Sequence, residues 1–231
     1  MKEILSMPVF AIMIYLLAFE AGIYINKKTK LAFLNPLMLA MVFVMIALII
    51  LKIPLEDYKK GGDFISMFLT PATVILAVPL YKNIGALKKD YIAIFAGVIA
   101  GCVTAVFSIW ALSKAFALQK DITVSLVPKS ITTPLGIELS KQLQGIPSVT
   151  VAAIIITGIV GAIFAPVVLK IFKITDKTAK GIAIGTSAHA LGTTKAVELG
   201  ETEGAMSGLA IGLAGLITVI IATVLYNIGF F

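Results

Sequence analysis

Long apolar runs alternate with short polar segments along the whole chain. The eight runs fall at residues 4–25, 31–51, 64–81, 91–113, 122–143, 148–172, 179–199 and 204–230. Most of them reach the ~20 residues that a helix needs to cross the hydrocarbon core of a bilayer. The pattern therefore predicts an all-α integral membrane protein in which hydrophobic helices take up nearly the entire chain.

The composition agrees with a membrane protein, because 59% of the residues are hydrophobic, 13% are charged and the mean hydropathy is +1.05. An ordinary globular domain has about 25% charged residues. No connection between the runs is long enough for a soluble domain. We interpret the first run as a retained span, since it is long for a signal-peptide core and lacks a small-residue cleavage site. The expected location is the cell membrane, with several spans.

Charge and reactive residues exclude several classes of function. The net charge of +7 comes from 19 lysines without any arginine, and most of them lie in short connections. This distribution is a signal of membrane topology and not a nucleic-acid footprint. Cys102 is the single cysteine, so the sequence offers neither a disulfide framework nor a cysteine metal site. Hydrolase, nucleotide-binding and zinc motifs are absent from the sequence. We expect no enzyme activity, metal, cofactor or nucleic-acid partner.

Three stretches share a pattern in which a polar broken segment is followed by a charged end and a glycine-containing apolar helix. They are residues 70–107, 128–167 and 186–222. Their period of about 60 residues suggests helical hairpins as the building unit. Paired hairpins would form two inverted-type repeats, residues 1–118 and 119–231, within one compact transmembrane domain.

The lysine distribution predicts that an odd number of the runs between the two lysine clusters do not cross the membrane fully. The lysine clusters at 27–30 and 170–180 should both face the cytoplasm. Eight simple crossings would place these clusters on opposite sides. The proline-interrupted runs at 64–81 and 122–143 are therefore candidates for re-entrant segments.

The segment Val127–Pro134 is the strongest candidate for a binding site. The segment places a lysine and three hydroxyls between two prolines, at the depth of the membrane interior. A broken backbone is tolerated at that depth only where protein or water surrounds it. A lysine that reaches to the interface is the alternative. The candidate substrate ligands are Lys129, Ser130, Thr132 and Thr133, and the helix-breaking residues are Pro128 and Pro134.

A similar break is predicted earlier in the chain, at Thr70, Pro71 and Thr73. The proline removes a backbone donor and biases Thr70 away from helix, so that carbonyls and hydroxyls become available to a ligand. An ordinary proline kink, with threonines bonded to the preceding turn, is an equally good interpretation.

The third polar stretch, 185–195, contains the only histidine. His189 shares a helix face with Thr193 if the segment is helical, and either side chain, like that of Ser187, is a candidate substrate ligand. Gly192 permits close backbone approach and is a further helix-breaking candidate. His189 and Glu20 are candidates for proton coupling. A packing histidine is the alternative, and for Glu20 an ion pair or an interfacial position remains open.

Together these motifs resemble the LrgB/CidB family. The resemblance rests on Leu69–Thr73, Val78–Lys82, Val127–Pro134, Ile156–Ile159 and Gly185–Thr193, in the same order, and covers nearly the whole chain. It implies two accounts of function. Bacterial relatives are associated with antiholin-like control of murein hydrolase activity and autolysis, together with a small LrgA- or CidA-type membrane partner. Plastid relatives are associated with transport of glycolate and glycerate, and bacterial ones also with pyruvate.

Broken helices and an internal lysine favour transport, because a passive lytic pore needs neither. The sequence therefore predicts a carrier for small monocarboxylates of the glycolate, glycerate, pyruvate or lactate class, coupled to protons by alternating access. The alternative is an antiholin-like regulator that acts with the LrgA-type partner. A homodimer is expected from transporter architecture in general.

Overall fold

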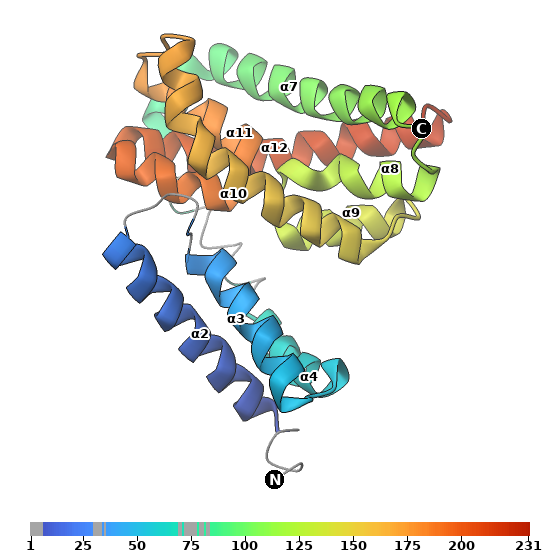
Figure 1. Ribbon diagram of the computed structural model, residues 1–231. Helices are drawn as coiled ribbons and strands as arrows, with labels where there is room; N and C mark the ends of the chain where they lie inside the picture. Colours follow the sequence, from blue (N-terminus) through green and yellow to red (C-terminus); the bar gives the residue numbers. More distant parts are fainter. Residues whose placement is uncertain are drawn as a thin grey trace. The chain divides into compact units, whose positions relative to one another are not determined.

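The computed structural model describes residues 7–29, 34, 36–68, 71, 78, 81 and 84–231, and the regular elements in this part are all helices. The chain divides into two compact units, residues 1–73 and 74–231, which are described separately (Figure 1). This division concerns compactness and does not test the predicted repeats 1–118 and 119–231, which stay a prediction.

The first unit contains three helices, α2 (Pro8–Thr29), α3 (Pro36–Leu51) and α4 (Leu55–Ser66). The apolar helices α2 and α3 pack through Ile14, Ala18, Ala40 and Val44. Helix α4 has charged residues on one side and lies against the start of α2, where Gly61 meets Pro8 and Ala11. Helix α2 is long and apolar enough to cross a membrane, whereas the apolar part of α3 is shorter.

Three long helices, α7 (Ile84–Ala115), α10 (Pro147–Ile171) and α12 (Glu201–Asn227), form the frame of the second unit. Helices α7 and α12 run side by side in the same direction (Figure 1). One apolar cluster joins the first halves of the two helices, for example Ile94 to Met206. At the far end, the Trp110 Nε1–H donates to the carbonyl oxygen of Phe230 over 3.2 Å. All three helices contain a segment able to span a membrane.

Residues 120–142 form a first broken hairpin, made of α8 (Lys120–Leu126), the 3-10 turn η1 (Val127–Ser130) and α9 (Thr133–Gln142). The backbone of Ile131 and Thr132 is extended, so the helix is interrupted at the predicted segment. The chain then returns beside itself, because a methyl group added at Gly136 would lie 3.6 Å from the Cβ atom of Pro128. The run 122–143 therefore doubles back.

Helix α11 (Lys177–Leu199) forms a second broken hairpin. His189 has φ 41° and ψ −140°, which interrupts the helix and separates a first limb, 177–188, from a second limb, 190–199. A methyl group added at Gly192 would lie 3.0 Å from Cγ2 of Ile184, eight residues earlier. In a straight helix these positions would be about 12 Å apart. The chain thus reverses at His189, and both limbs pack on α12.

The two hairpins begin at opposite ends of the frame. Ile182, in the first limb of α11, packs with Ile94 and Met206 near the start of α7 and α12. Val124, in α8, packs with Ile109 and Ala222 near the opposite end. A broken hairpin followed by a long helix therefore occurs twice, as α8–η1–α9 before α10 and as α11 before α12.

Of the eight expected runs, four contain helices long and apolar enough to span a membrane by length and composition. Two of the remaining runs, 122–143 and 179–199, lie in described residues. Their helices do not span because each is interrupted and folds back. The run 64–81 lies largely outside the described residues, so its predicted re-entrant character stays a prediction.

Candidate functional site

The tip of the first broken hairpin carries an ammonium group without an acidic partner. Lys129 is half-buried, and its Nζ donates a hydrogen bond to Oγ of Ser130 over 3.0 Å. The ion pairs found among the described residues involve other lysines. A partly buried charge is costly unless it is paired, which suits a site that receives an anion.

Two hydroxyls beside Lys129 are buried. Ser130 is 6% exposed and Thr132 is 7% exposed, and the Thr132 hydroxyl has no hydrogen-bond partner in the structure. Thr132 is the N-cap residue of α9, but its side chain makes no capping hydrogen bond. Pro134 lies in the first turn of α9, where its missing N–H costs little. Thr133, also predicted as a ligand, is half-buried.

His189 forms the tip of the second broken hairpin and is 3% exposed. Its Nε2 lies 2.8 Å from the carbonyl oxygen of Ile154, in α10. A carbonyl only accepts hydrogen bonds, so Nε2 carries the proton and the lone pair of the neutral ring lies on Nδ1. The tips of the two hairpins are neighbours, because the turn η1 contacts α11 and both hairpins meet Ile154 of α10.

Thr193 lies in the first turn of the second limb and stabilises the break. Its Oγ1 donates to the carbonyl oxygen of His189 over 3.0 Å, which satisfies a backbone group that the interruption releases. The same Oγ1 lies 2.7 Å from Oγ of Ser207, in α12. The predicted relation between His189 and Thr193 thus exists, although it does not arise from the face of an uninterrupted helix. A methyl group added at Gly192 would lie 2.5 Å from Cβ of Ala188 and 3.0 Å from Cγ2 of Ile184, so the chain passes close to itself there.

Glycines let both tips approach α10 closely. A methyl group added at Gly158 would lie 2.6 Å from Cε1 of His189 and 2.8 Å from Cβ of Leu191. A methyl group at Gly136, in the first hairpin, would meet Cδ1 of Ile154. Ile154 therefore lies between the two hairpins, in contact with one through its carbonyl and near the other through its side chain.

Other predicted residues lie elsewhere. Ser187 is exposed and donates back to the carbonyl oxygen of Ala183 over 2.7 Å, so its hydroxyl is used within its own helix. Thr70 and Thr73 lie outside the described residues, and Pro71 is exposed. Glu20 is exposed on α2 of the first unit. The roles predicted for these residues stay predictions.

The structure adds polar residues that sequence reasoning did not assign to the site. Thr186 is 6% exposed and its hydroxyl has no partner; its Cγ2 lies close to Gly101 in α7. Ser207 is fully buried and bonds to Thr193. Thr186 belongs to the polar stretch that contains His189, which is a signal in the sequence, whereas Ser207 stands in an apolar helix with no such signal.

A buried hydroxyl network fastens the ends of the first broken hairpin to α10. Oγ1 of Thr150 lies 2.8 Å from the carbonyl oxygen of Ser125 and 2.7 Å from Oγ of Ser140. Oγ of Ser125 also accepts a hydrogen bond from the backbone N–H of Ile146 over 2.6 Å. Both limbs of the hairpin are thereby joined to the helix that follows it.

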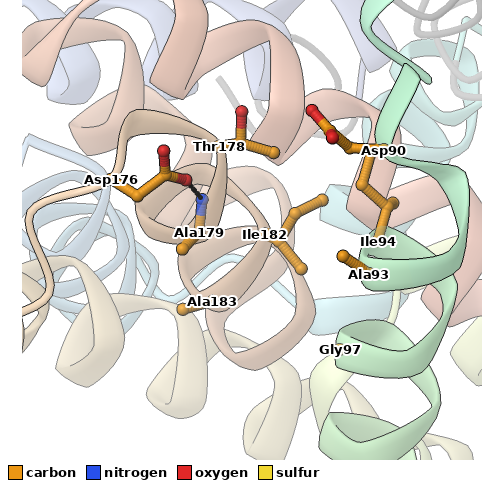
Figure 2. Close-up of a pocket in the computed structure, with 9 residues that line it drawn as sticks. All are labelled: Asp90, Ala93, Ile94, Gly97, Asp176, Thr178, Ala179, Ile182 and Ala183. Atoms are coloured by element: carbon orange, nitrogen blue, oxygen red, sulfur yellow. Dashed lines mark hydrogen bonds between the residues drawn. The ribbon is translucent and has the colours of Figure 1, made fainter. Parts of the chain in front are cut away.

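A cavity of about 470 Å³ lies away from the tips, between the start of α7 and the first limb of α11 (Figure 2). Its lining is mostly apolar and includes two carboxylates, of which Asp176 accepts a hydrogen bond from the Ala179 N–H over 2.8 Å. Asp90 faces the cavity from α7 (Figure 2). In the described part of the chain, no group of three histidine, cysteine or acidic residues is arranged to hold a metal.

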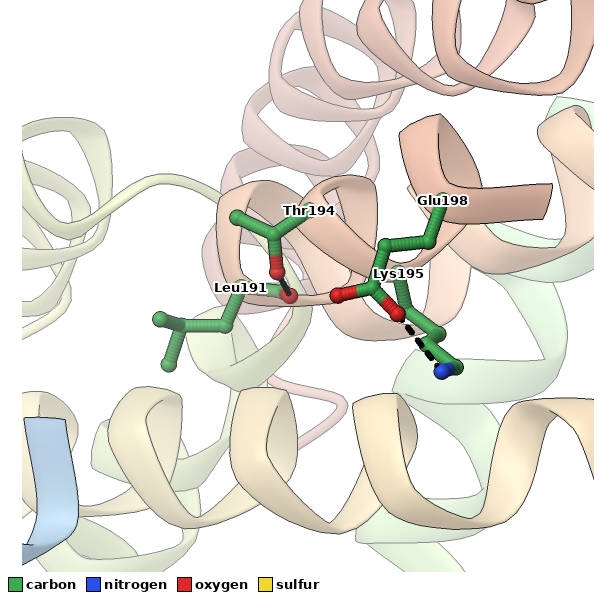
Figure 3. A network of polar contacts seen from close by, with 4 residues as sticks. All are labelled: Leu191, Thr194, Lys195 and Glu198. Atoms are coloured by element: carbon green, nitrogen blue, oxygen red, sulfur yellow. Dashed lines mark hydrogen bonds and ion pairs between the residues drawn. The ribbon is translucent and has the colours of Figure 1, made fainter. Parts of the chain in front are cut away.

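The exposed end of the second limb has its own polar contacts (Figure 3). Nζ of Lys195 lies 2.7 Å from Oε2 of Glu198, and Oγ1 of Thr194 donates to the carbonyl oxygen of Leu191 over 2.7 Å. Because these groups are exposed or half-exposed, their contribution to stability is small.

The long apolar helices and the two broken hairpins with neighbouring tips define an all-helical membrane protein with a polar centre. The chain belongs to the LrgB-like family, whose model matches residues 15–228. It is 38% identical to antiholin-like protein LrgB from Bacillus subtilis (strain 168) over 94% of both chains. It is also 35% identical to antiholin-like protein LrgB from Bacillus mycoides (strain KBAB4), over 93% of this chain and 94% of that relative. No solved structure matches the chain.

Proposed function

We propose that this chain is an antiholin-like membrane protein and that its molecular activity is to carry a small monocarboxylate past the tips of its two broken hairpins. The names of its relatives support the first part, and they name no transported solute. The geometry of the tips supports the second part. The observation on which it depends is that one tip holds the ammonium of Lys129, which has no acidic partner among the described residues, and, three residues later, the unpartnered hydroxyl of Thr132.

A carboxylate fits this site for electrostatic reasons. Lys129 supplies one positive charge, and the first turn of α9 supplies backbone N–H groups and the positive end of a helix dipole. Thr132 supplies a buried hydroxyl that has no other partner. One charge and a few donors match a small monoanion better than a phosphate or a dicarboxylate, which would call for more compensating charge.

His189 supports proton coupling. With Nε2 held by the carbonyl oxygen of Ile154, Nδ1 is left to accept a proton or the hydroxyl group of a substrate. Protonation would place a second positive charge near Lys129, and a bound carboxylate would stabilise it. Proton and substrate binding would therefore favour each other, as cotransport requires.

The hairpins give a route for alternating access. They begin at opposite ends of the α7–α10–α12 frame, so each tip separates the centre from one end. Small movements of either hairpin against α10 would open the centre to one side at a time. Lysines at the end of α10 and the start of α11, such as Lys173 and Lys177, support a cytoplasmic position for that end of the second unit.

The carrier proposal is tested with purified protein in liposomes. Uptake of labelled glycolate and pyruvate is measured under an inward acid gradient. Lys129→Ala should abolish saturable uptake, whereas the matched control Lys141→Ala should retain it because Lys141 forms only an exposed pair with Glu138. Wild-type uptake by folded Lys129→Ala protein would refute the assignment of the carboxylate site.

Thr132→Val provides a second test of the same site. Replacing an unpartnered buried hydroxyl by a methyl group should leave thermal stability unchanged or raised. The KM for substrate should increase, because a hydrogen bond to the carboxylate is lost. A loss of stability with unchanged KM would show that the hydroxyl has a structural role instead.

The antiholin-like part is tested separately, in cells with and without an LrgA-type partner. We expect deletion of this chain to change murein hydrolase activity or autolysis. If Lys129→Ala complements the deletion as fully as the wild-type protein does, regulation does not depend on transport. If neither variant has an effect without the partner, the two proteins act as one system.

A further inference from the structure

A small cavity of about 170 Å³ lies at the end of α7, where α8 begins, apart from the two hairpin tips. The lining comes from the last turns of α7, the first turns of α8 and the C-terminal residue. The lining residues are Trp110, Ser113, Lys114, Leu118, Lys120, Thr123 and Phe231. This combination of two cations with an aromatic residue has no role in the proposed transport site.

The cavity has a net positive charge, because its lining holds two lysines and a single acidic group, the terminal carboxylate of Phe231. Both side chains are exposed, and the ion pairs found among the described residues include neither Lys114 nor Lys120. Nζ of Lys120 lies 4.7 Å from the ring centre of Tyr226, an arrangement that orders the ammonium without neutralising it. Two like charges beside one small cavity favour an anion between them.

One buried donor in the cavity is also without a partner. Ser113 is 3% exposed, and its Oγ has no hydrogen-bond partner among the described residues. The other polar groups of the lining are occupied, since Nε1 of Trp110 donates to Phe230 and Oγ1 of Thr123 donates to Gln119 over 3.0 Å. The donors left for a ligand are one hydroxyl and two ammoniums, which outnumber the one carboxylate of the lining, that of Phe231, and suit the oxygens of a phosphate group.

We propose that this cavity binds the phosphodiester group of an anionic phospholipid. The site lies at the ends of two membrane-spanning segments, which finish at Ala115 and Asn227, and so at the level of lipid headgroups. Tryptophan and tyrosine are typical of that level. Leu112 and Phe116 are 53% and 73% exposed beside the lysines and offer an apolar surface to the acyl chains. A free phosphate ion has the same oxygens but no use for this surface.

Trp110 allows a direct test, because it is the only tryptophan in the chain and it lines the cavity. The purified full chain in neutral detergent is titrated with short-chain phosphatidylglycerol, phosphatidylcholine or inorganic phosphate, and Trp110 emission is recorded. We expect saturable binding of phosphatidylglycerol. The double substitution Lys114→Gln, Lys120→Gln should weaken it at least about tenfold, since each lysine near a lipid surface contributes appreciably to anion binding.

Matched variants keep the test decisive. Lys141→Gln removes an exposed lysine that is paired with Glu138 and should bind lipid as wild type does. Ser113→Ala should weaken binding severalfold while the emission without lipid stays the same, which confirms that the cavity is intact. Equal binding of phosphatidylcholine, or equal binding by the double variant, would overturn the proposal. Binding of inorganic phosphate as tight as that of phosphatidylglycerol would also overturn the lipid proposal, because it would assign the site to a free ion.

Discussion

Replacing Gly158 with alanine tests whether the second hairpin tip rests on α10 as the structure indicates. The added methyl group would lie 2.6 Å from Cε1 of His189 and 2.8 Å from Cβ of Leu191. These distances are about 0.7–0.9 Å shorter than the ~3.5 Å at which two carbon atoms attract each other best. The Leu191 Cβ is bonded to the backbone and cannot rotate away, so the tip or α10 must shift.

The magnitude follows from two opposing effects. Overpacking of a well-packed site costs about 1–3 kcal/mol. Alanine in place of glycine stabilises a helix interior by about 0.5–1 kcal/mol. We therefore expect Gly158→Ala to lower the free energy of unfolding by about 1–2 kcal/mol. The shift should also lengthen the contact between His189 and Ile154 and reduce proton-driven uptake.

The matched control is Gly212→Ala in α12, where no atom lies within 4 Å of the added methyl group. This variant gains helix propensity without a clash and should be as stable as wild type or more stable. Thermal unfolding of both variants is measured in the same detergent, together with uptake in liposomes. If Gly158→Ala unfolds at the same temperature as Gly212→Ala, the tip does not pack on α10 in this way.

Two further predictions concern hydrogen bonds. Thr150→Val should lower the free energy of unfolding by about 1–3 kcal/mol, because it leaves the buried Ser140 hydroxyl without this partner. The control Thr194→Val, at an exposed site, should change it little. Chemical denaturation compares the two variants, and equal losses would contradict the network's role. Glu198→Gln should change the free energy of unfolding by less than about 0.5 kcal/mol at low and high salt, because its pair with Lys195 is exposed. A larger, salt-sensitive loss in thermal melts would show that the ion pair stabilises the fold.

The first broken hairpin was predictable because its signals are local. Two prolines bracket Lys129, and proline both removes a donor and restricts the residue before it. The structure places the interruption within that segment. The fastening of its ends through Thr150 was not predicted, since serine and threonine in apolar helices give no indication of which distant hydroxyl they meet.

The second interruption was harder to locate. The sequence indicated a polar stretch with glycines but has no proline there, and helical spacing of His189 and Thr193 suggested a continuous face. The backbone instead reverses at His189, a residue with positive φ, and this conformation is strained for a side-chain-bearing residue. Tertiary contacts with Gly158 and Ile154 hold it, and such contacts between distant segments cannot be read from a local pattern.

The two breaks share a pattern of hydrogen bonding that bears on function. Two backbone carbonyls at the tips are satisfied: that of His189 accepts from Thr193, and that of Thr132 accepts from the Gly136 N–H over 2.8 Å. Two side-chain donors of the first tip keep capacity for a ligand: the hydroxyl of Thr132, which has no partner among the described residues, and the ammonium of Lys129, which bonds to Oγ of Ser130 but has no acidic partner there. A membrane protein can tolerate irregular backbone only when its polar groups are paired. Donors left over after that requirement is met are available to a ligand, which is why we assign the substrate to the tip of the first hairpin.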